Sequence, residues 1–252
     1  MAQESINMIL TAHQPAYLPW LGLIHKIAVS DAYVYLDNVQ FEKNSFTNRN
    51  KIKTANGPIW LTVPVFLKDH TKKTIKDIKI DNAKNWQESH WKSICLNYKK
   101  SPYFNKYSDF FENMYKQKWD SLSEVNDYML RWFLKELGIK VEYYKASELN
   151  FQLHKSDLVL EMCKKLEADL YVFGALGKDY AKEEDFNKEG IKIYFQDYKH
   201  PIYPQLYNEF IPSMGIIDLL FNCGDKSLEI LMGNNISKKE LTEKICSTET
   251  KF

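Results

Sequence analysis

Two residues near the N-terminus carry side chains that can hold or move a proton. His13 comes soon after a short apolar run, Ile6 to Leu10, that we predict to be a strand. Asp37 ends a second apolar run, Ala32 to Leu36. The unperturbed pKa of histidine lies near neutrality, so His13 suits a general base or a phosphate contact, and a turn histidine bonded to backbone is the alternative. Asp37 suits a contact to a hydroxyl, an amine or a cation, and a turn-forming aspartate is the alternative.

The segment Asn44 to Lys53 is the most polar cluster of the chain and contains no acidic residue. An arginine guanidinium binds phosphate through a rigid fork of donors. The excess of positive charge favours an anionic ligand, with a solvated loop as the alternative. The expected contacts to that ligand are Lys43, Asn48, Arg49, Asn50 and Lys53.

A third candidate begins at Gly174, which follows an apolar run that ends at Phe173. Glycines at such a turn let backbone N–H groups approach a ligand, and the start of a helix favours an anion. Lys178 could then pair with phosphate and Asp179 could act as a base, while a tight strand-to-helix turn is the alternative. The spacing matches neither a dinucleotide-binding nor a Walker motif.

The full expected site combines these clusters with polar side chains that follow the same runs. The expected catalytic residues are His13, Asp37 and Asp179. The further expected substrate contacts are Gln14, Tyr17, Gln40, Gly174, Lys178, Tyr180 and Gln205. We expect no metal site, and the sequence identifies no cofactor. Asp218 stands between apolar residues of a predicted helix, and because a buried carboxylate must be paired or must shift its pKa, we favour a structural ion pair there.

Several blocks of the chain, taken together, are similar to one known family. They read HQPAYLPWLG, SDAYVYLDNVQFEKNSFTNRNKIK, WLTVPV, LYVFGALGKDY, KHPIYPQ and SMGIIDLLFNCG. In combination and in this order they resemble the WbqC-like family, over a span from about Met8 to Gly233. The resemblance implies a part in the biosynthesis of bacterial surface polysaccharide of the O-antigen type, and it implies no particular reaction.

Composition limits the class of protein. With 34 basic and 33 acidic residues, the formal charge of +1 gives no overall field that would attract nucleic acid or a membrane surface. No basic-then-apolar leader opens the chain, and no window approaches the roughly 18 apolar residues of a spanning helix. The four cysteines lack metal-ligand spacing. We therefore expect a reduced, cytoplasmic protein that binds no nucleic acid and does not insert into a membrane.

Strand and helix patterns alternate on both sides of a helical stretch, which predicts an α/β fold of Rossmann-like type with a mainly parallel sheet and a helical insertion. A half-exposed strand is also expected at Thr74 to Ile80. The five strands expected in the sheet are Ile6–Leu10, Tyr33–Leu36, Lys140–Tyr144, Leu170–Phe173 and Lys192–Phe195. The expected parts are 1–81 and 139–236 for the α/β domain, 82–138 for the insertion, and 237–252 for a frayed tail.

Three functions remain open. The first is a transferase that attaches an acyl or aminoacyl group to the amine of a nucleotide-linked amino sugar. Its partners would be that nucleotide-linked sugar and a thioester donor, either CoA or a carrier protein. The second is a nucleotidyltransferase with His13 and Lys178 on a triphosphate. The third is a non-catalytic protein that binds a glycan intermediate.

Overall fold

The computed structural model describes residues 6–207 and 209–248, and its centre is a five-stranded parallel sheet. The strands are β1 (Ile9–His13), β2 (Ala32–Tyr35), β5 (Glu142–Lys145), β6 (Leu170–Phe173) and β7 (Lys192–Phe195). Their order is β5-β2-β1-β6-β7. Strands β2 and β5, which follow β1 in the chain, lie on one side of it, and the later strands β6 and β7 lie on the other side. The boundary between β1 and β6 is therefore the topological switch point, where open α/β sheets bind ligands.

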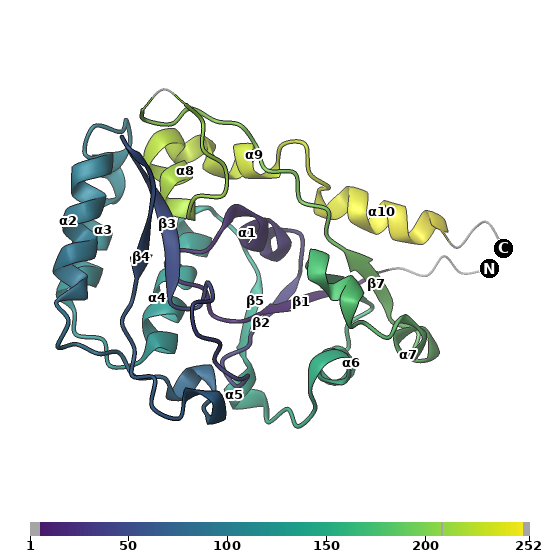
Figure 1. Cartoon of the computed structure of the whole chain (residues 1–252). Coiled ribbons are helices and arrows are strands. Elements are labelled where there is room, and N and C mark those ends of the chain that lie inside the picture. Colours follow the sequence, from purple (N-terminus) through teal and green to yellow (C-terminus); the bar gives the residue numbers. More distant parts are fainter. Residues whose placement is uncertain (1–5, 208, 249–252) are drawn as a thin grey trace.

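Helices cover both faces of the sheet (Figure 1). Successive side chains of each strand point to opposite faces, and because both sets are apolar, both faces must be covered. Leu10, Ala12 and Val34 pack against α6 (Lys155–Lys165) and α7 (Glu183–Lys188). Ile9 and Val172 point the other way and pack with α10 (Lys238–Thr248). On that face Tyr33 and Tyr35 join the core that includes α1 (Leu21–Ala28). The prediction of a parallel α/β sheet is confirmed.

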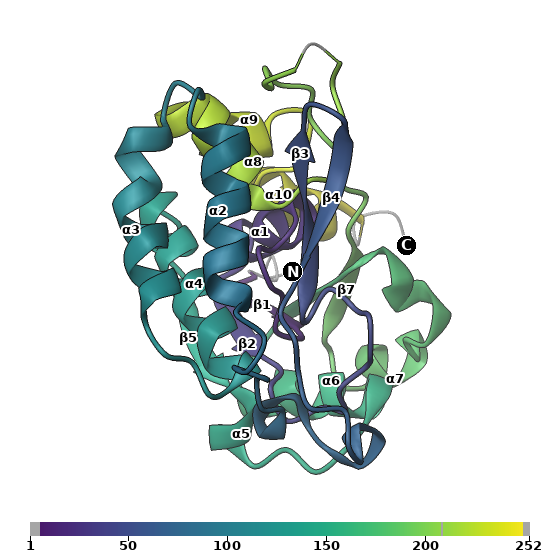
Figure 2. The same cartoon turned by 60° about the vertical axis from the view of Figure 1, so that its left-hand side comes forward.

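Three helices and a hairpin form a second layer beside the sheet (Figure 2). The helices are α2 (Trp86–Tyr98), α3 (Phe104–Lys116) and α4 (Leu122–Glu136), and the antiparallel hairpin is β3 (Arg49–Thr54) with β4 (Gly57–Thr62). Phe221 of α8 (Ile216–Cys223) meets the rings of Tyr98, Phe104 and Phe111 at centroid distances of 5.3, 5.3 and 5.4 Å. These aromatic side chains of α2 and α3 are thus buried against α8. The short elements are η1 (His70–Lys72), η2 (Ile75–Asp77), α5 (Ala146–Leu149), η3 (Ala175–Asp179), η4 (Gly224–Lys226) and α9 (Ser227–Met232).

Several bounds differ from the sequence prediction. β2 is Ala32–Tyr35 instead of Tyr33–Leu36, and β5 is Glu142–Lys145 instead of Lys140–Tyr144. The first strand begins at Ile9 and pairs with β2 as far as His13↔Tyr35, so His13 is the last strand residue and does not lie in a loop. The segment Thr74 to Ile80 forms no continuous strand: Ile75–Asp77 is the 3-10 turn η2, and Thr74, Lys79 and Ile80 make only isolated bridges. Two of its three buried side chains, Ile75 and Ile78, are three residues apart, which is the period of a 3-10 helix, and the third, Ile80, follows the turn.

The tail and the polar segment are also more ordered than expected. Beyond Ile236 the chain forms α10, whose Leu241 is fully buried, while residues 249–252 of the expected frayed tail lie outside the described residues. A reciprocal cap starts α10, with Ser237 Oγ accepting from the Glu240 N–H and the Glu240 carboxylate accepting from Ser237. The segment Asn44 to Lys53 is a loop only as far as Asn48, and β3 begins at Arg49. None of the helices formed by the described residues has the length and apolarity needed to cross a membrane.

Candidate functional site

At the switch point, side-chain hydrogen bonds replace the backbone pairing between β1 and β6. Backbone pairing between β1 and β6 is limited to Ile9↔Leu170 and Leu10↔Tyr171, whereas β1 pairs with β2 up to His13. Beyond Leu10, the Thr11 hydroxyl donates to the carbonyl of Val172 at 2.8 Å. The Lys26 ammonium of α1 donates to the carbonyl of Ala12 at 2.9 Å. The carboxyl ends of the two central strands therefore separate, with polar side chains between them.

His13 ends β1 at this opening and is held in one tautomer. Its Nδ1 lies 2.8 Å from the carbonyl oxygen of Gln14. Because a carbonyl only accepts, Nδ1 carries the proton of the neutral ring and Nε2 is the basic nitrogen. Burial, and to a smaller extent the nearby charge of Lys26, lowers the pKa of His13 to about 3, although the hydrogen bond to Gln14 opposes this shift. The ring is therefore neutral at physiological pH, and no described residue makes a hydrogen bond with Nε2.

Lys26 is a residue that sequence reasoning missed. It is only 4% exposed, and burial lowers its pKa to about 7. None of the ion pairs among described residues involves it. A sequence signal was present, because this lysine stands between Ile24 and Ile27 in the apolar helix LGLIHKIA.

A row of aromatic rings leads from His13 to the surface of the hairpin. The Trp20 ring meets His13 edge-on at 5.0 Å, Phe46 lies 5.3 Å from Trp20, and Trp60 lies 5.9 Å from Phe46. Phe46 is 45% exposed and Trp60 is 42% exposed. We call these four side chains the aromatic row. The sequence showed many aromatic residues but not which of them assemble here.

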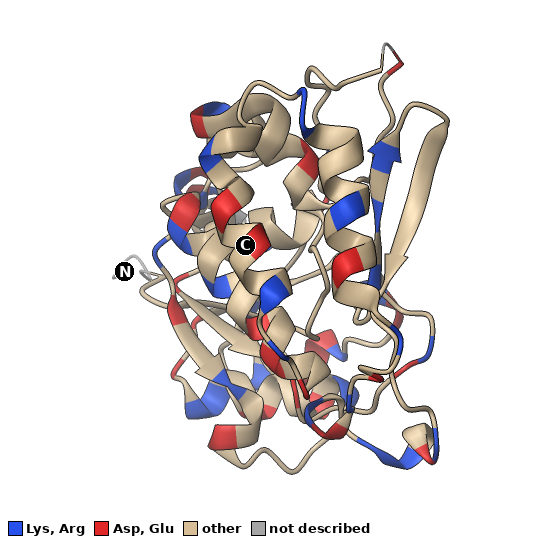
Figure 3. Ribbon diagram, turned by 90° about the vertical axis from the view of Figure 1, so that its left-hand side faces the viewer, with Lys and Arg blue, Asp and Glu red and all other residues tan. Residues whose placement is uncertain are grey.

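Two cations lie over the outer end of the aromatic row. The Arg49 guanidinium is 4.4 Å and the Lys51 ammonium 5.0 Å from the centroid of the Trp60 ring. Strands β3 and β4 contain no acidic residue, and Figure 3 shows the basic positions along β3. Neither cation takes part in an ion pair among described residues. The exposed end of the row is therefore a positively charged aromatic surface.

The other polar residues of this segment brace the hairpin. The Asn50 carboxamide donates to the carbonyl of Leu18 at 2.5 Å, and that of Asn48 donates to Val63 at 3.0 Å. Lys53 is 2% exposed and donates to the carbonyl of Glu209. Asn48 Oδ1 and Arg49 Nε are buried without a hydrogen-bond partner among described residues. The Asn50 contact therefore holds β3 against the loop that follows β1, and the Lys53 contact holds it against the loop that follows β7.

Asp37 lies at the same edge of the sheet, but its carboxylate is occupied. One oxygen accepts from the Ser147 N–H at 2.9 Å and the other from the Ser147 hydroxyl at 2.6 Å. These bonds connect the end of β2 to the start of α5. Gln40 is exposed in an isolated bridge with Thr74, and Lys43 is exposed in a turn.

The Gly174 turn follows β6 and lies at the same edge as His13, since the two strands are parallel. A side chain at Gly174 would meet no atom within 4 Å, whereas one at Gly177 would lie 2.6 Å from Phe173 Cβ. The turn continues as η3, a five-residue 3-10 helix that is too short to present an anion site at its start. The remaining predicted residues of this turn, Lys178, Asp179 and Tyr180, are exposed on it.

Tyr17 and Gln205 belong to two buried networks, whereas Gln14 is partly exposed beside His13. The Tyr17 hydroxyl contacts His90 Nδ1 at 2.8 Å and the Tyr115 hydroxyl at 2.5 Å. Gln205 donates to Asp218 at 2.7 Å.

Asp218 is fully buried in α8, and burial raises its pKa. Its carboxylate accepts from Tyr98 at 2.8 Å and from Tyr203 at 2.9 Å, which offsets part of that rise. Hydrogen bonds, and not the favoured ion pair, thus satisfy this carboxylate.

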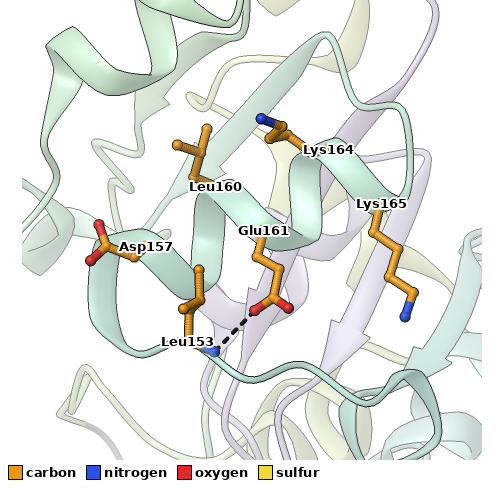
Figure 4. A pocket seen from close by; sticks show the side chains of 6 residues that line it. All are labelled: Leu153, Asp157, Leu160, Glu161, Lys164 and Lys165. Carbon is orange, nitrogen blue, oxygen red and sulfur yellow. Dashed lines mark hydrogen bonds between the residues drawn. The ribbon is translucent and has the colours of Figure 1, made fainter.

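One surface depression of about 580 Å³ lies away from all of these residues (Figure 4). It lies along α6, on the opposite side of the sheet from α1. Its lining residues are Leu153, Asp157, Leu160, Glu161, Lys164 and Lys165. The described residues contain no group of three His, Cys, Asp or Glu side chains placed to hold a metal ion.

The fold and this site define an α/β protein with a charged aromatic surface that leads to a histidine at the switch point of a parallel sheet. The chain matches the model of the WbqC-like protein family over residues 14–230, and it belongs to that family. It is also similar to Uncharacterized protein Rv1507c of Mycobacterium tuberculosis, with 30% identity over 220 residues. That match covers 86% of this chain and 95% of the relative.

Proposed function

We propose that this protein is a cytosolic enzyme of surface-glycan biosynthesis that transfers an acyl or aminoacyl group to the amine of a nucleotide-linked amino sugar. The observation that carries the proposal is the aromatic row with Arg49 and Lys51 at its outer end. The strand order supports a Rossmann-like fold, in which nucleotides bind at the switch point. The family resemblance supports the glycan pathway.

The parts of a nucleotide-linked sugar match the parts of this surface. Aromatic faces such as Trp60 and Phe46 stack on bases and on the apolar faces of sugars. The Arg49 fork and the Lys51 ammonium suit the two phosphates between base and sugar. A ligand laid along the row with its base outermost brings the sugar toward His13.

His13 then serves the reaction as a proton acceptor. In acyl transfer the amine nitrogen attacks the thioester carbonyl, a C–N bond forms, and the C–S bond breaks to release a thiol. His13 Nε2, the basic nitrogen of the fixed tautomer, takes the proton lost by the amine and returns it to the departing sulfur, which leaves as the thiol. An anionic group of a ligand placed beside the imidazole would raise the pKa of His13, because an anion stabilises the imidazolium.

A binding panel tests this proposal. UDP- or dTDP-linked amino sugars should raise the melting temperature of the protein, and Arg49→Ala should lose most of that shift. Lys165→Met provides a matched control, because Lys165 also lies over an aromatic ring, Phe151, at 5.4 Å and away from the row. Stabilisation by ATP or CTP with magnesium alone would favour nucleotidyl transfer instead. If the protein binds the nucleotide-linked sugar but transfers no acyl group from a thioester, the result would favour a non-catalytic binding protein.

A further inference from the structure

We propose that Lys26 forms an anion subsite at the switch point, where its ammonium meets a phosphate or carboxylate oxygen of a bound substrate. The identity of that substrate rests on the proposed function, whereas the subsite itself rests on the geometry between β1 and β6. It lies at the inner end of the aromatic row, apart from the cations on the hairpin.

The first support is the position of the ammonium. Backbone pairing between β1 and β6 ends at Leu10↔Tyr171, and Lys26 Nζ lies 2.9 Å from the carbonyl of Ala12 just beyond that point. His13 is the next residue, and its ring is close enough for the charge of Lys26 to influence it. The ammonium thus lies where the crevice of an open α/β sheet begins.

The second support is the missing counter-charge. Buried charges in proteins are normally paired, because an unpaired charge is costly to remove from water. Lys26 is only 4% exposed, and no carboxylate of the described residues forms an ion pair with it. The neighbouring His25 contacts Gln196 through Nδ1 and the carbonyl of Ile236 through Nε2, so it supplies no negative charge.

The third support is that the Lys26 ammonium has N–H donors without an acceptor among the described residues. An ammonium has three N–H donors, and Lys26 makes one hydrogen bond among the described residues. A carbonyl at a strand end needs only one donor, which a neutral side chain would supply without a buried charge. A ligand oxygen would satisfy the remaining donors and neutralise the charge. The lowered pKa of Lys26 has the same cause, since burial without a counter-ion disfavours the charged form.

The test measures inorganic pyrophosphate and acetate binding by calorimetry in a protein that lacks the hairpin cations. In the Arg49→Ala, Lys51→Met double variant, pyrophosphate or acetate should still bind. Adding Lys26→Met, or Lys26→Gln in a second variant, should weaken that binding at least tenfold. The melting temperature of the ligand-free protein should stay unchanged or rise, since a buried charge is removed. Pyrophosphate binding alone identifies a phosphate subsite, and acetate binding alone identifies a carboxylate subsite.

Several results would overturn the subsite. These are binding of neither anion to the double variant, equal binding with and without Lys26, or a clear loss of ligand-free stability in both Lys26 variants. The last result would mean that Lys26 is a structural brace for Ala12. The outcome is independent of the proposed function, because loss of nucleotide-sugar binding in Arg49→Ala alone concerns only the hairpin surface.

Discussion

The Tyr98 hydroxyl donates a 2.8 Å hydrogen bond to Asp218 and accepts a 2.9 Å hydrogen bond from the backbone N–H of Lys53. One phenol therefore connects α2, α8 and β3. Tyr203 and Gln205 donate to the other carboxylate oxygen and bring in the loop that follows β7. The strand that carries Arg49 and Lys51 is thus fixed from behind by a buried polar network.

Tyr98→Phe should lower the free energy of unfolding by about 1–3 kcal/mol, because it leaves a buried carboxylate oxygen and a buried N–H each without a partner. Urea denaturation followed by circular dichroism measures the change. Tyr128→Phe is the matched control, since Tyr128 is 38% exposed and its hydroxyl makes no hydrogen bond among described residues. A Tyr98→Phe protein as stable as the Tyr128→Phe protein would show that the network adds nothing.

His90 should make the protein sensitive to acid. Burial lowers the pKa of His90 from 6.5 to about 4, so between these values the unfolded chain binds more protons than the folded one. Stability therefore falls as pH falls through this window, by at most about 3 kcal/mol for this group. His90→Gln should flatten the decline in melting temperature between pH 6.5 and 4, and the exposed His154→Gln should not. Identical pH profiles for His90→Gln and the parent would refute this assignment.

The two glycines after β6 should respond differently to alanine. A Cβ at Gly177 would lie 2.6 Å from Phe173 Cβ, so Gly177→Ala should destabilise by about 1–3 kcal/mol through overpacking. A Cβ at Gly174 would meet nothing within 4 Å, so Gly174→Ala should change stability by less than about 0.5 kcal/mol. Thermal denaturation of both proteins makes the comparison, and equal losses would contradict the packing argument.

His13→Gln should reduce turnover while sparing ligand binding. General-base catalysis contributes roughly 10²- to 10⁴-fold, so acyl transfer from a thioester to a nucleotide-linked amino sugar should slow by about that factor. The dissociation constant for the nucleotide-sugar should stay within about twofold, because the phosphate contacts lie on the hairpin. Mass spectrometry of the product and calorimetry of binding separate the two effects. Parental turnover in His13→Gln would remove His13 from the reaction.

The sheet could be predicted from the sequence because its signals are local. The apolar runs at Leu170–Phe173 and Lys192–Phe195 carry their strand periodicity within a few residues, and both strands have the predicted bounds. The alternation of strands and helices then indicated a parallel sheet. The bounds of β1 depended on pairing with β2, a contact between segments, so the predicted strand ended three residues early.

The candidate site was only partly predictable because it depends on tertiary contacts. His13 and Arg49 were identified from their residue types, but the rings of Trp20, Phe46 and Trp60 come together only through the fold of the hairpin onto the loop after β1. The polarity of Asn50 and Lys53 suggested ligand contacts, whereas their side chains bind backbone carbonyls. A polar residue type shows that the side chain needs a hydrogen-bond partner, but it does not show whether that partner belongs to a ligand or to the protein.

The most direct test of the proposed binding surface is a calorimetric titration of a UDP-linked amino sugar into the parent, Trp60→Ala and Tyr128→Ala proteins. Stacking on an aromatic side chain contributes about 1–3 kcal/mol per base. Trp60→Ala should therefore bind at least about fivefold more weakly than the parent, while Tyr128→Ala, which removes an aromatic ring of similar exposure on α4, should bind as the parent does. Equal affinity of the parent and Trp60→Ala proteins would contradict the account.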